Sequence, residues 1–371
     1  MKRFYIFLIL IIISALFFGC SSSEKAPSEN TTLTQSENQN SVYLQNNAYI
    51  ESCYPQSIFA DNNTVTSLMY DENSQKIILA RINSDTAVYI DDDFSVTCKT
   101  EQTDGATAVI DFGKNKTVRL YDNNNLTKTG EYDLSPYYEN SVLKTYTGSD
   151  IIISQNAEIA FFVDTNEKQY IYYLQSPDSE AQVIYEFNRL SYSDNEISYI
   201  TRLLCLTDDK LYFEGAISEN GISSNKAVLG YIIINKGEIT ELTRETAVSF
   251  YACGKTIYSQ DYQLNSSDTG SGRILIYDTE TNTSHTVKTE KPAESLNCKV
   301  SANGKFLCTL QNGANNSIIT IYNIKSDKVI KSAETTPDYI ADMLCIDGES
   351  RTIYMPVSYT HLRAHETSQD L

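Results

Sequence analysis

A repeat of about 45 to 50 residues constrains the fold of this chain more than any other feature. Short apolar runs that begin with Lys or Arg start at residues 210, 255, 305 and 351, in steps of 45, 50 and 46. A second marker, an apolar or aromatic residue pair followed by Asp or Asn, ends at Asn235, Asp278 and Asn323, in steps of 43 and 45. Two independent markers with a similar period indicate successive copies of one structural unit.

Each unit reads as several short strands. Between Tyr49 and Pro356, apolar and aromatic runs alternate with clusters of Asn, Asp, Gly, Ser and Lys, which is typical of strands joined by turns. No run of ten or more residues has clean helical spacing. The sequence therefore predicts an all-β fold.

One unit carries a recognisable sequence motif. The turn Asn303-Gly304-Lys305 precedes the strand residues Phe306-Leu307, and Ile318 to Asn323 then lead into Lys325-Ser326-Asp327-Lys328. This motif resembles those in the blades of WD40- or YVTN-like β-propellers, although the chain contains no Trp. The resemblance implies a β-propeller of about seven four-stranded blades with the last blade truncated; eight blades, or β-sandwich domains, are the alternatives. We expect units near 49 to 105, 106 to 148, 149 to 197, 198 to 246, 247 to 291 and 292 to 338, and a seventh from 339.

The N-terminus predicts export. Basic Lys2 and Arg3 precede an apolar run from Phe4 to Phe18, and Gly19-Cys20 follows. At 1.5 Å per residue this run spans roughly 22 Å, less than the roughly 30 Å of a bilayer core. The ending resembles the lipobox of bacterial lipoproteins, although Phe17 and Phe18 depart from its usual residues. It implies cleavage of residues 1–19 as a signal peptide and acylation of Cys20; an uncleaved anchor is the alternative.

Two further segments differ from the repeats. Residues 20–48 are rich in Ser, Asn, Thr, Gln and Glu and nearly free of large apolar side chains, so we expect a disordered tether before the propeller-like domain of residues 49–356. The tail 357–371 (VSYTHLRAHETSQDL) resembles a translated sequencing adapter. The resemblance implies that this tail is non-native and that the domain is incomplete at its C-terminal end. His361 and His365 are therefore excluded as functional residues.

Four cysteines follow the period. Cys205, Cys253, Cys298 and Cys345 are separated by 48, 45 and 47 residues, so we expect one equivalent position in four units. Small buried residues of a crowded inner strand are the favoured interpretation. A Cys298–Cys308 disulfide and a thiolate metal site are the alternatives.

Signals for catalysis are sparse. His285 is expected in a solvated loop, Gly270-Ser271-Gly272 is not followed by a helix, and the turn residues Asp91-Asp92-Asp93 and Asp122 to Asn125 lack the spacing of a calcium-binding loop. The pairs Tyr137-Tyr138 and Tyr172-Tyr173 are expected in packing. The sequence therefore predicts one site residue, the lipid-bearing Cys20, and no catalytic, cofactor-binding or metal-binding residue.

The net charge of −19 argues against nucleic-acid binding. We expect an extracytoplasmic lipoprotein, anchored to the bacterial membrane through Cys20, whose propeller binds or scaffolds a protein, peptide or glycan. A glycan hydrolase or lyase is one alternative, although an enzyme is the less favoured class because the chain before the tail holds a single His. A structural or sensory subunit of an envelope complex is the other alternative.

Overall fold

The computed structural model describes residues 53–61, 64–71, 75–81, 86–89, 98–103, 105–113, 115–139, 141–142, 150–188, 195–219, 222–261, 272–289, 296–312, 317–335, 345–346 and 353–354. The predicted signal peptide, the tether, Cys20 and the tail 357–371 lie outside these residues. Within them, no helix is long and apolar enough to cross a membrane.

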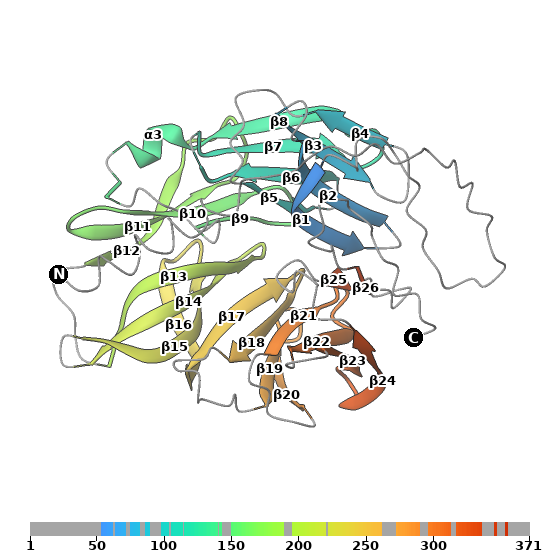
Figure 1. Ribbon diagram of the computed structural model, residues 1–371. Coiled ribbons are helices and arrows are strands. Elements are labelled where there is room, and N and C mark those ends of the chain that lie inside the picture. Colours follow the sequence, from blue (N-terminus) through green and yellow to red (C-terminus); the bar gives the residue numbers. More distant parts are fainter. Residues whose placement is uncertain are drawn as a thin grey trace, which may run out of the picture. The chain divides into compact units, whose positions relative to one another are not determined.

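The described residues form a β-propeller with six four-stranded blades and one two-stranded sheet (Figure 1). Blades 1 to 3 consist of β1 (Cys53–Asp61), β2 (Thr64–Asp71), β3 (Lys76–Arg81) and β4 (Thr86–Tyr89); β5 (Cys98–Gln102), β6 (Ala106–Asp111), β7 (Thr117–Asp122) and β8 (Lys128–Asp133); and β9 (Ile151–Ile153), β10 (Ile159–Asp164), β11 (Lys168–Leu174) and β12 (Gln182–Asn188). Blades 4 to 6 consist of β13 (Ile197–Leu206), β14 (Lys210–Glu219), β15 (Ile222–Ile233) and β16 (Glu238–Thr246); β17 (Val248–Cys253), β18 (Thr256–Asp261), β19 (Arg273–Asp278) and β20 (Thr283–Lys288); and β21 (Leu296–Val300), β22 (Phe306–Asn312), β23 (Ser317–Asn323) and β24 (Lys328–Thr335). The two-stranded sheet pairs β25 (Cys345–Ile346) with β26 (Ile353–Tyr354).

The prediction of about seven blades was wrong, as were its alternatives of eight blades and of β-sandwich domains. The described residues supply four strands to each of six sheets, whereas the described residues of the unit expected from residue 339 supply β25 and β26 alone. The predicted start of the second unit at residue 106 was also wrong, because β5 begins that blade at Cys98. Its remaining residues, Lys99 to Gln102, are all polar, which hides the strand from a hydrophobicity pattern.

In blades 2 to 6 the fourth strand is the most exposed strand of its blade. In blade 3, β9 and β10 are buried at every position, β11 alternates between buried and partly exposed residues, and β12 is mostly exposed. A strand buried on both faces requires a continuous apolar run, and Ile151-Ile152-Ile153 provides one. The alternation of β11 is that of a strand with one buried face.

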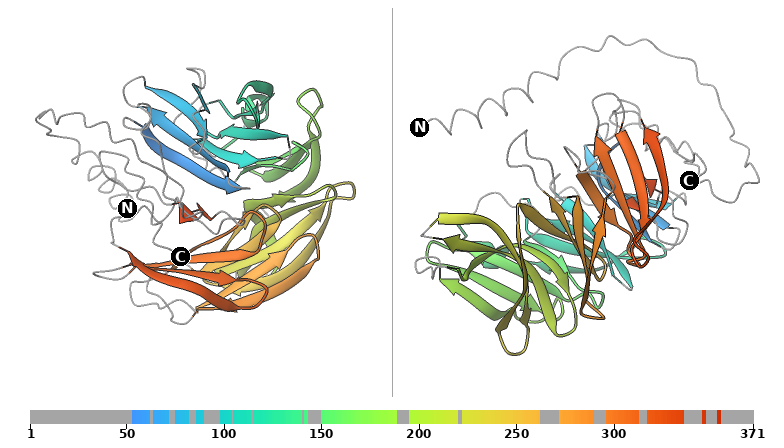
Figure 2. Two further views of the ribbon diagram at one scale, coloured as in Figure 1. Left: turned by 90° about the vertical axis from the view of Figure 1, so that its right-hand side faces the viewer. Right: turned by 90° about the horizontal axis from the view of Figure 1, so that it is seen from below.

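The hydrophobic core consists of layers between neighbouring blades. Separate clusters join blades 1 and 2, 2 and 3, 3 and 4, 4 and 5, and 5 and 6. A further cluster packs Ile346 and Ile353 against β22 and β23 of blade 6. In the left view of Figure 2 the blades succeed one another around a common centre. The strand β25 contacts both β21 and β1, so the short sheet lies between the last blade and the first.

A short helix, α3 (Ser135–Tyr138), follows blade 2. Its Tyr137 and Tyr138 pack against Phe161 of β10, with ring centroids 5.3 and 5.8 Å away, and Tyr172 of β11 stacks on the same Phe161 at 5.1 Å. These tyrosines therefore serve packing, as expected from the sequence.

Candidate functional site

The hub of the propeller is formed by the first strand of each blade: β1, β5, β9, β13, β17 and β21. Neighbouring strands of this series contact each other, and a hydrogen bond from the Lys99 side chain joins β5 to β9. Each of them pairs with the second strand of its blade along one edge only. The other edge, here called the hub edge, presents main-chain N–H and C=O groups that have no strand partner. Such an edge needs other hydrogen-bond partners, because unpaired main-chain groups are costly where they are shielded from water.

Polar side chains of the neighbouring blade supply these partners. The hub-edge hydrogen bonds run from Thr100 N to Ser57 Oγ (3.1 Å), Lys99 Nζ to Ile151 O (3.1 Å), Ile153 N to Glu101 Oε2 (3.3 Å), Ile200 N to Gln169 Oε1 (2.7 Å), Gln169 Nε2 to Ile200 O (2.9 Å), Arg202 Nη1 to Phe250 O (2.9 Å), Phe250 N to Glu214 Oε2 (2.5 Å) and Cys298 N to Gln260 Oε1 (3.5 Å). These hydrogen bonds, here called hub-edge caps, therefore connect each blade to the next across five interfaces, from blade 1 to blade 6.

This arrangement explains why charged residues lie in the hub. Glu214 is buried, and its two oxygens accept hydrogen bonds from Phe250 N and from Thr201 Oγ1. Lys99 and Glu101 also form an ion pair of 2.6 Å with each other. These charges fix the geometry of the neighbouring strand, so their presence is not by itself a sign of catalysis.

One group of hub residues retains unused hydrogen-bonding capacity. Arg202 of β13, Tyr251 of β17 and Lys299 of β21, here called the Tyr251 cluster, come from three successive blades and are all partly exposed. The Arg202 guanidinium carbon lies 4.4 Å from the centroid of the Tyr251 ring, and Lys299 Nζ lies 5.8 Å from it. Two cations thus lie within 6 Å of one aromatic ring.

Neither cation of the Tyr251 cluster forms an ion pair within the described part of the chain. Arg202 donates one hydrogen bond, to Phe250 O, and Glu214, its cross-strand neighbour, is engaged elsewhere. The cross-strand neighbour of Lys299 is Cys308, which carries no carboxylate. Guanidinium and ammonium groups with unused donors are suited to binding an anionic group.

The cluster was missed at the sequence level. Arg202, Tyr251 and Lys299 belong to no known motif, and contacts between them form only when three blades pack together. A signal was nevertheless present, because the three residues are separated by 49 and 48 residues, which is the repeat period. Aligning the units by their period would have placed them on three first strands, but not at one height, because the three lie at different distances from the turns that follow them.

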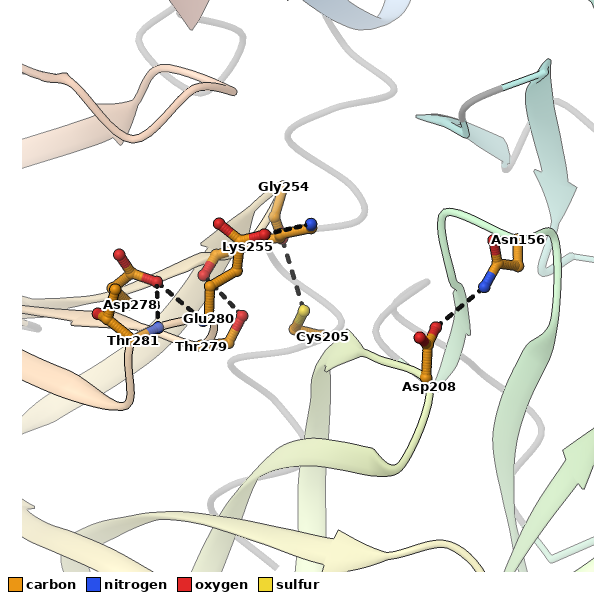
Figure 3. Close-up of polar contacts among 9 residues, drawn as sticks. All are labelled: Asn156, Cys205, Asp208, Gly254, Lys255, Asp278, Thr279, Glu280 and Thr281. Carbon is orange, nitrogen blue, oxygen red and sulfur yellow. Dashed lines mark hydrogen bonds and ion pairs between the residues drawn. The ribbon is translucent and has the colours of Figure 1, made fainter.

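The turns at one end of the hub strands also connect blades (Figure 3). Asn156, between β9 and β10, donates a hydrogen bond of 2.9 Å to Asp208, between β13 and β14. The Cys205 thiol lies 3.5 Å from the carbonyl oxygen of Gly254 in the next blade, and Lys255 forms an ion pair of 2.5 Å with Glu280. These contacts fix one turn against another and leave the Tyr251 cluster as the better candidate for ligand binding.

Within the described residues, the structure brings none of the catalytic or metal-binding candidates weighed from the sequence into a common site. His285 is exposed on β20, not in a loop as expected. Asp122 Oδ1 accepts hydrogen bonds from Asn124 N and Asn125 N, as a turn residue does. Asp91 to Asp93, Gly270, His361 and His365 lie outside the described residues. Among the described residues, no group of three or more His, Cys, Asp or Glu side chains has a metal-binding arrangement.

The four phased cysteines all lie on the first strand of their sheets, as expected for the inner strand, and Cys205 and Cys298 are buried whereas Cys253 and Cys345 are partly exposed. The expectation that they share one position along that strand was wrong. Cys205 pairs with Tyr212, Cys253 with Thr256, Cys298 with Thr309 and Cys345 with Tyr354, so the four lie at different distances from the turn that follows them. Cys298 and Cys308 are both free thiols, so the disulfide alternative was also wrong. Burial raises the pKa of Cys298 to about 12, which is typical of a structural cysteine.

A second group of ionisable residues is buried between blades 2 and 3. Asp150, before β9, accepts a hydrogen bond of 3.3 Å from the Tyr138 hydroxyl, and its Oδ1 has no hydrogen-bond partner. Burial raises the pKa of Asp150, against the opposing charges of Lys116 and Lys99. Burial lowers the pKa of Lys116, against the opposing charges of Asp150 and Asp111. The pKa values of both groups are thus shifted in the direction of neutral pH.

Comparison with known proteins supports the fold alone. No protein-family model matches the chain, and no curated protein matches its sequence. Oligogalacturonate lyase from Vibrio parahaemolyticus has a similar structure, with a TM-score of 0.52, 11% identity, and coverage of 84% of this chain and 88% of the lyase. Hydrazine synthase from Kuenenia stuttgartiensis gives a TM-score of 0.50, 11% identity and coverage of 85% and 96%. The Cps50 (Swd1) β-propeller domain of Myceliophteria thermophila gives 0.50, 9% and coverage of 84% and 96%.

Proposed function

We propose that this protein is a binding module tethered to the outer side of a bacterial membrane, with the Tyr251 cluster as its binding site. The observation that supports this function is the pair of cations, Arg202 and Lys299, that share one aromatic ring without a carboxylate partner among the described residues. The hub-edge hydrogen bonds hold the three strands of the cluster in fixed positions, and a preorganised site loses less entropy on binding.

A library screen tests the binding function. Membranes that carry the full-length protein are incubated with immobilised peptide and glycan libraries, and each ligand found is measured again with Tyr251→Leu. We expect the variant to lose at least tenfold in affinity. The matched control is Tyr185→Leu, in the outer strand β12 of blade 3, which should bind as the unchanged protein does. Failure of both libraries to yield a ligand, or equal binding by Tyr251→Leu, contradicts the proposal.

The membrane tether rests on the sequence. A short basic start, an apolar run below the length of a transmembrane helix, and Cys20 after Gly19 support acylation of Cys20 and an extracytoplasmic location. Cells that express Cys20→Ala should incorporate no labelled palmitate into the protein and should release it from the membrane fraction. Retention of the label in Cys20→Ala would exclude this tether.

A polysaccharide lyase or hydrolase is a second candidate, favoured by the buried pair Asp150 and Lys116. Shifted pKa values of an acid and a base are common where proton transfer occurs. Oligogalacturonate lyase shares the propeller fold, and this supports testing uronate polymers as substrates. Formation of unsaturated uronate products from polygalacturonate, absent in Lys116→Met, would favour the enzyme; no product from the unchanged protein argues against it.

A structural or sensory role in an envelope complex is distinguished from the binding function by co-purification. In that case the protein should co-purify with partner subunits from membranes, and Cys20→Ala should reduce their recovery. Under the binding function, recovery of the ligand depends on Tyr251 instead.

A further inference from the structure

We infer that the Tyr251 cluster recognises a single carboxylate group of a peptide. This inference deepens the binding function proposed above and rests on it. It names the ligand class and the two side chains, Arg202 and Lys299, that bind the carboxylate oxygens.

The charges of the cluster favour an anionic ligand. Arg202 and Lys299 approach the same Tyr251 ring, and each has donors that no described residue uses. Two neighbouring cations repel each other, and partial burial strengthens this repulsion because less water screens it. Glu214, the cross-strand neighbour of Arg202, accepts hydrogen bonds from Thr201 Oγ1 and Phe250 N, and no ion pair joins it to Arg202 in the described part of the chain. An anionic ligand group that contacts both cations would offset this repulsion.

The net charge of the chain favours a ligand with a single anionic group. The whole chain has a net charge of −19, so a polymer with many negative charges is repelled on approach. A single carboxylate meets little of this long-range repulsion and still satisfies the planar guanidinium fork of Arg202 and the ammonium of Lys299.

The surroundings of the Tyr251 ring favour a peptide over a sugar as the ligand. An acidic sugar would use the Tyr251 ring as a stacking platform, but that ring is occupied by Arg202 at 4.4 Å, by Lys299 at 5.8 Å and by a stacked Tyr258 at 5.9 Å. The ring therefore serves to position the cations. The Phe250 N–H and C=O groups beside it are also engaged, so a peptide cannot add a strand at Phe250, and its carboxylate is the group that the two cations can bind.

The experiment compares hexapeptides that lack acidic side chains, each with either a free or an amidated C-terminus, by fluorescence anisotropy with the full-length protein. We expect the free carboxylate to increase affinity at least tenfold, and Lys299→Gln to remove most of that increase. Lys325→Gln is the matched control, because Lys325 is an exposed lysine of the same blade, in the turn between β23 and β24. This control should bind like the unchanged protein. Lys299→Gln leaves the cap on Phe250 in place, so a folding defect is not expected, and circular dichroism checks for one.

Three results would overturn the inference. Equal binding of free and amidated peptides means that the carboxylate is not recognised. Unchanged selectivity in Lys299→Gln means that another site recognises it. Tighter, Lys299-dependent binding of a digalacturonate than of any peptide means that the ligand is an acidic sugar. In all three cases a ligand lost in Tyr251→Leu leaves the general binding function intact, whereas the absence of any ligand contradicts that function as well.

Discussion

At the scale of single residues, Asp150 is a buried group whose charge is costly to the folded state. It is 2% exposed, and its Oδ1 lacks a hydrogen-bond partner. Burial raises its pKa in the folded protein above that of an unfolded aspartate, although Lys116, Lys99 and Tyr138 partly oppose the change. The folded state therefore holds the proton more tightly than the unfolded state does, and folding becomes less favourable when the proton is lost.

The sign of this effect predicts the behaviour of Asp150→Asn. As pH rises from the unfolded pKa through the folded one, the unchanged protein loses stability at this position, whereas the amide has no proton to lose. The variant should therefore gain free energy of unfolding relative to the unchanged protein as pH rises. Urea unfolding at several pH values from about 4 to about 8 measures the difference. A difference that falls with pH would show that the charge of Lys116 outweighs burial.

At the scale of elements, the hub-edge caps predict that one buried glutamine holds two blades together. Gln169 of β11 is 0% exposed and binds both Ile200 N and Ile200 O of the next blade. Gln169→Ala leaves both groups of Ile200 without partners, which should cost about 2 to 4 kcal/mol in the free energy of unfolding. Gln175→Ala, at an exposed position of the same blade, is the control and should change it by less than about 0.5 kcal/mol. Equal effects of both variants would disprove the structural role of the cap.

Turn geometry predicts that alanine lowers stability at Gly254 but not at Gly105. Gly254 has φ +55°, and a Cβ there would lie 2.7 Å from the Ala302 carbonyl oxygen of the next blade. Gly254→Ala should therefore lower stability by about 1 to 3 kcal/mol. Gly105 lies in the corresponding turn of blade 2, where a Cβ would meet no atom within 4 Å, so Gly105→Ala should have little effect. Thermal unfolding of the two variants tests this, and an equal loss in both contradicts the contact with Ala302.

For the whole molecule, the sequence predicted the all-β propeller fold and several blade starts, but not the contacts between blades. The predicted starts at 198 and 247 lie within one residue of β13 and β17, because strand and turn patterns are local. The start of blade 2 was missed because Lys99, Thr100 and Glu101 serve the neighbouring strands instead of the core. The Tyr251 cluster was missed for the same reason, since its contacts exist only between packed blades. The prediction for Cys20 lies outside the described residues and was not tested.

Closure of the propeller rests on a small element. The strands β25 and β26 contribute only two residues each, yet β25 contacts both β21 and β1, and Ile346 and Ile353 are buried against blade 6. In a propeller each blade interface depends on its neighbours. Weakening this sheet should therefore loosen the first blade and the sixth together, although their residues are far apart in the sequence.

Ile346→Ala tests this coupling. Removing a side chain that is 2% exposed leaves a cavity and should cost about 2 to 4 kcal/mol in the free energy of unfolding. Hydrogen exchange should become faster in both β1 and β21, because β25 contacts both strands. Val329→Ala, at a position of β24 that is 37% exposed, removes an apolar side chain without opening a cavity and serves as the control. Faster exchange in β21 alone would mean that β25 completes blade 6 but does not close the propeller onto blade 1.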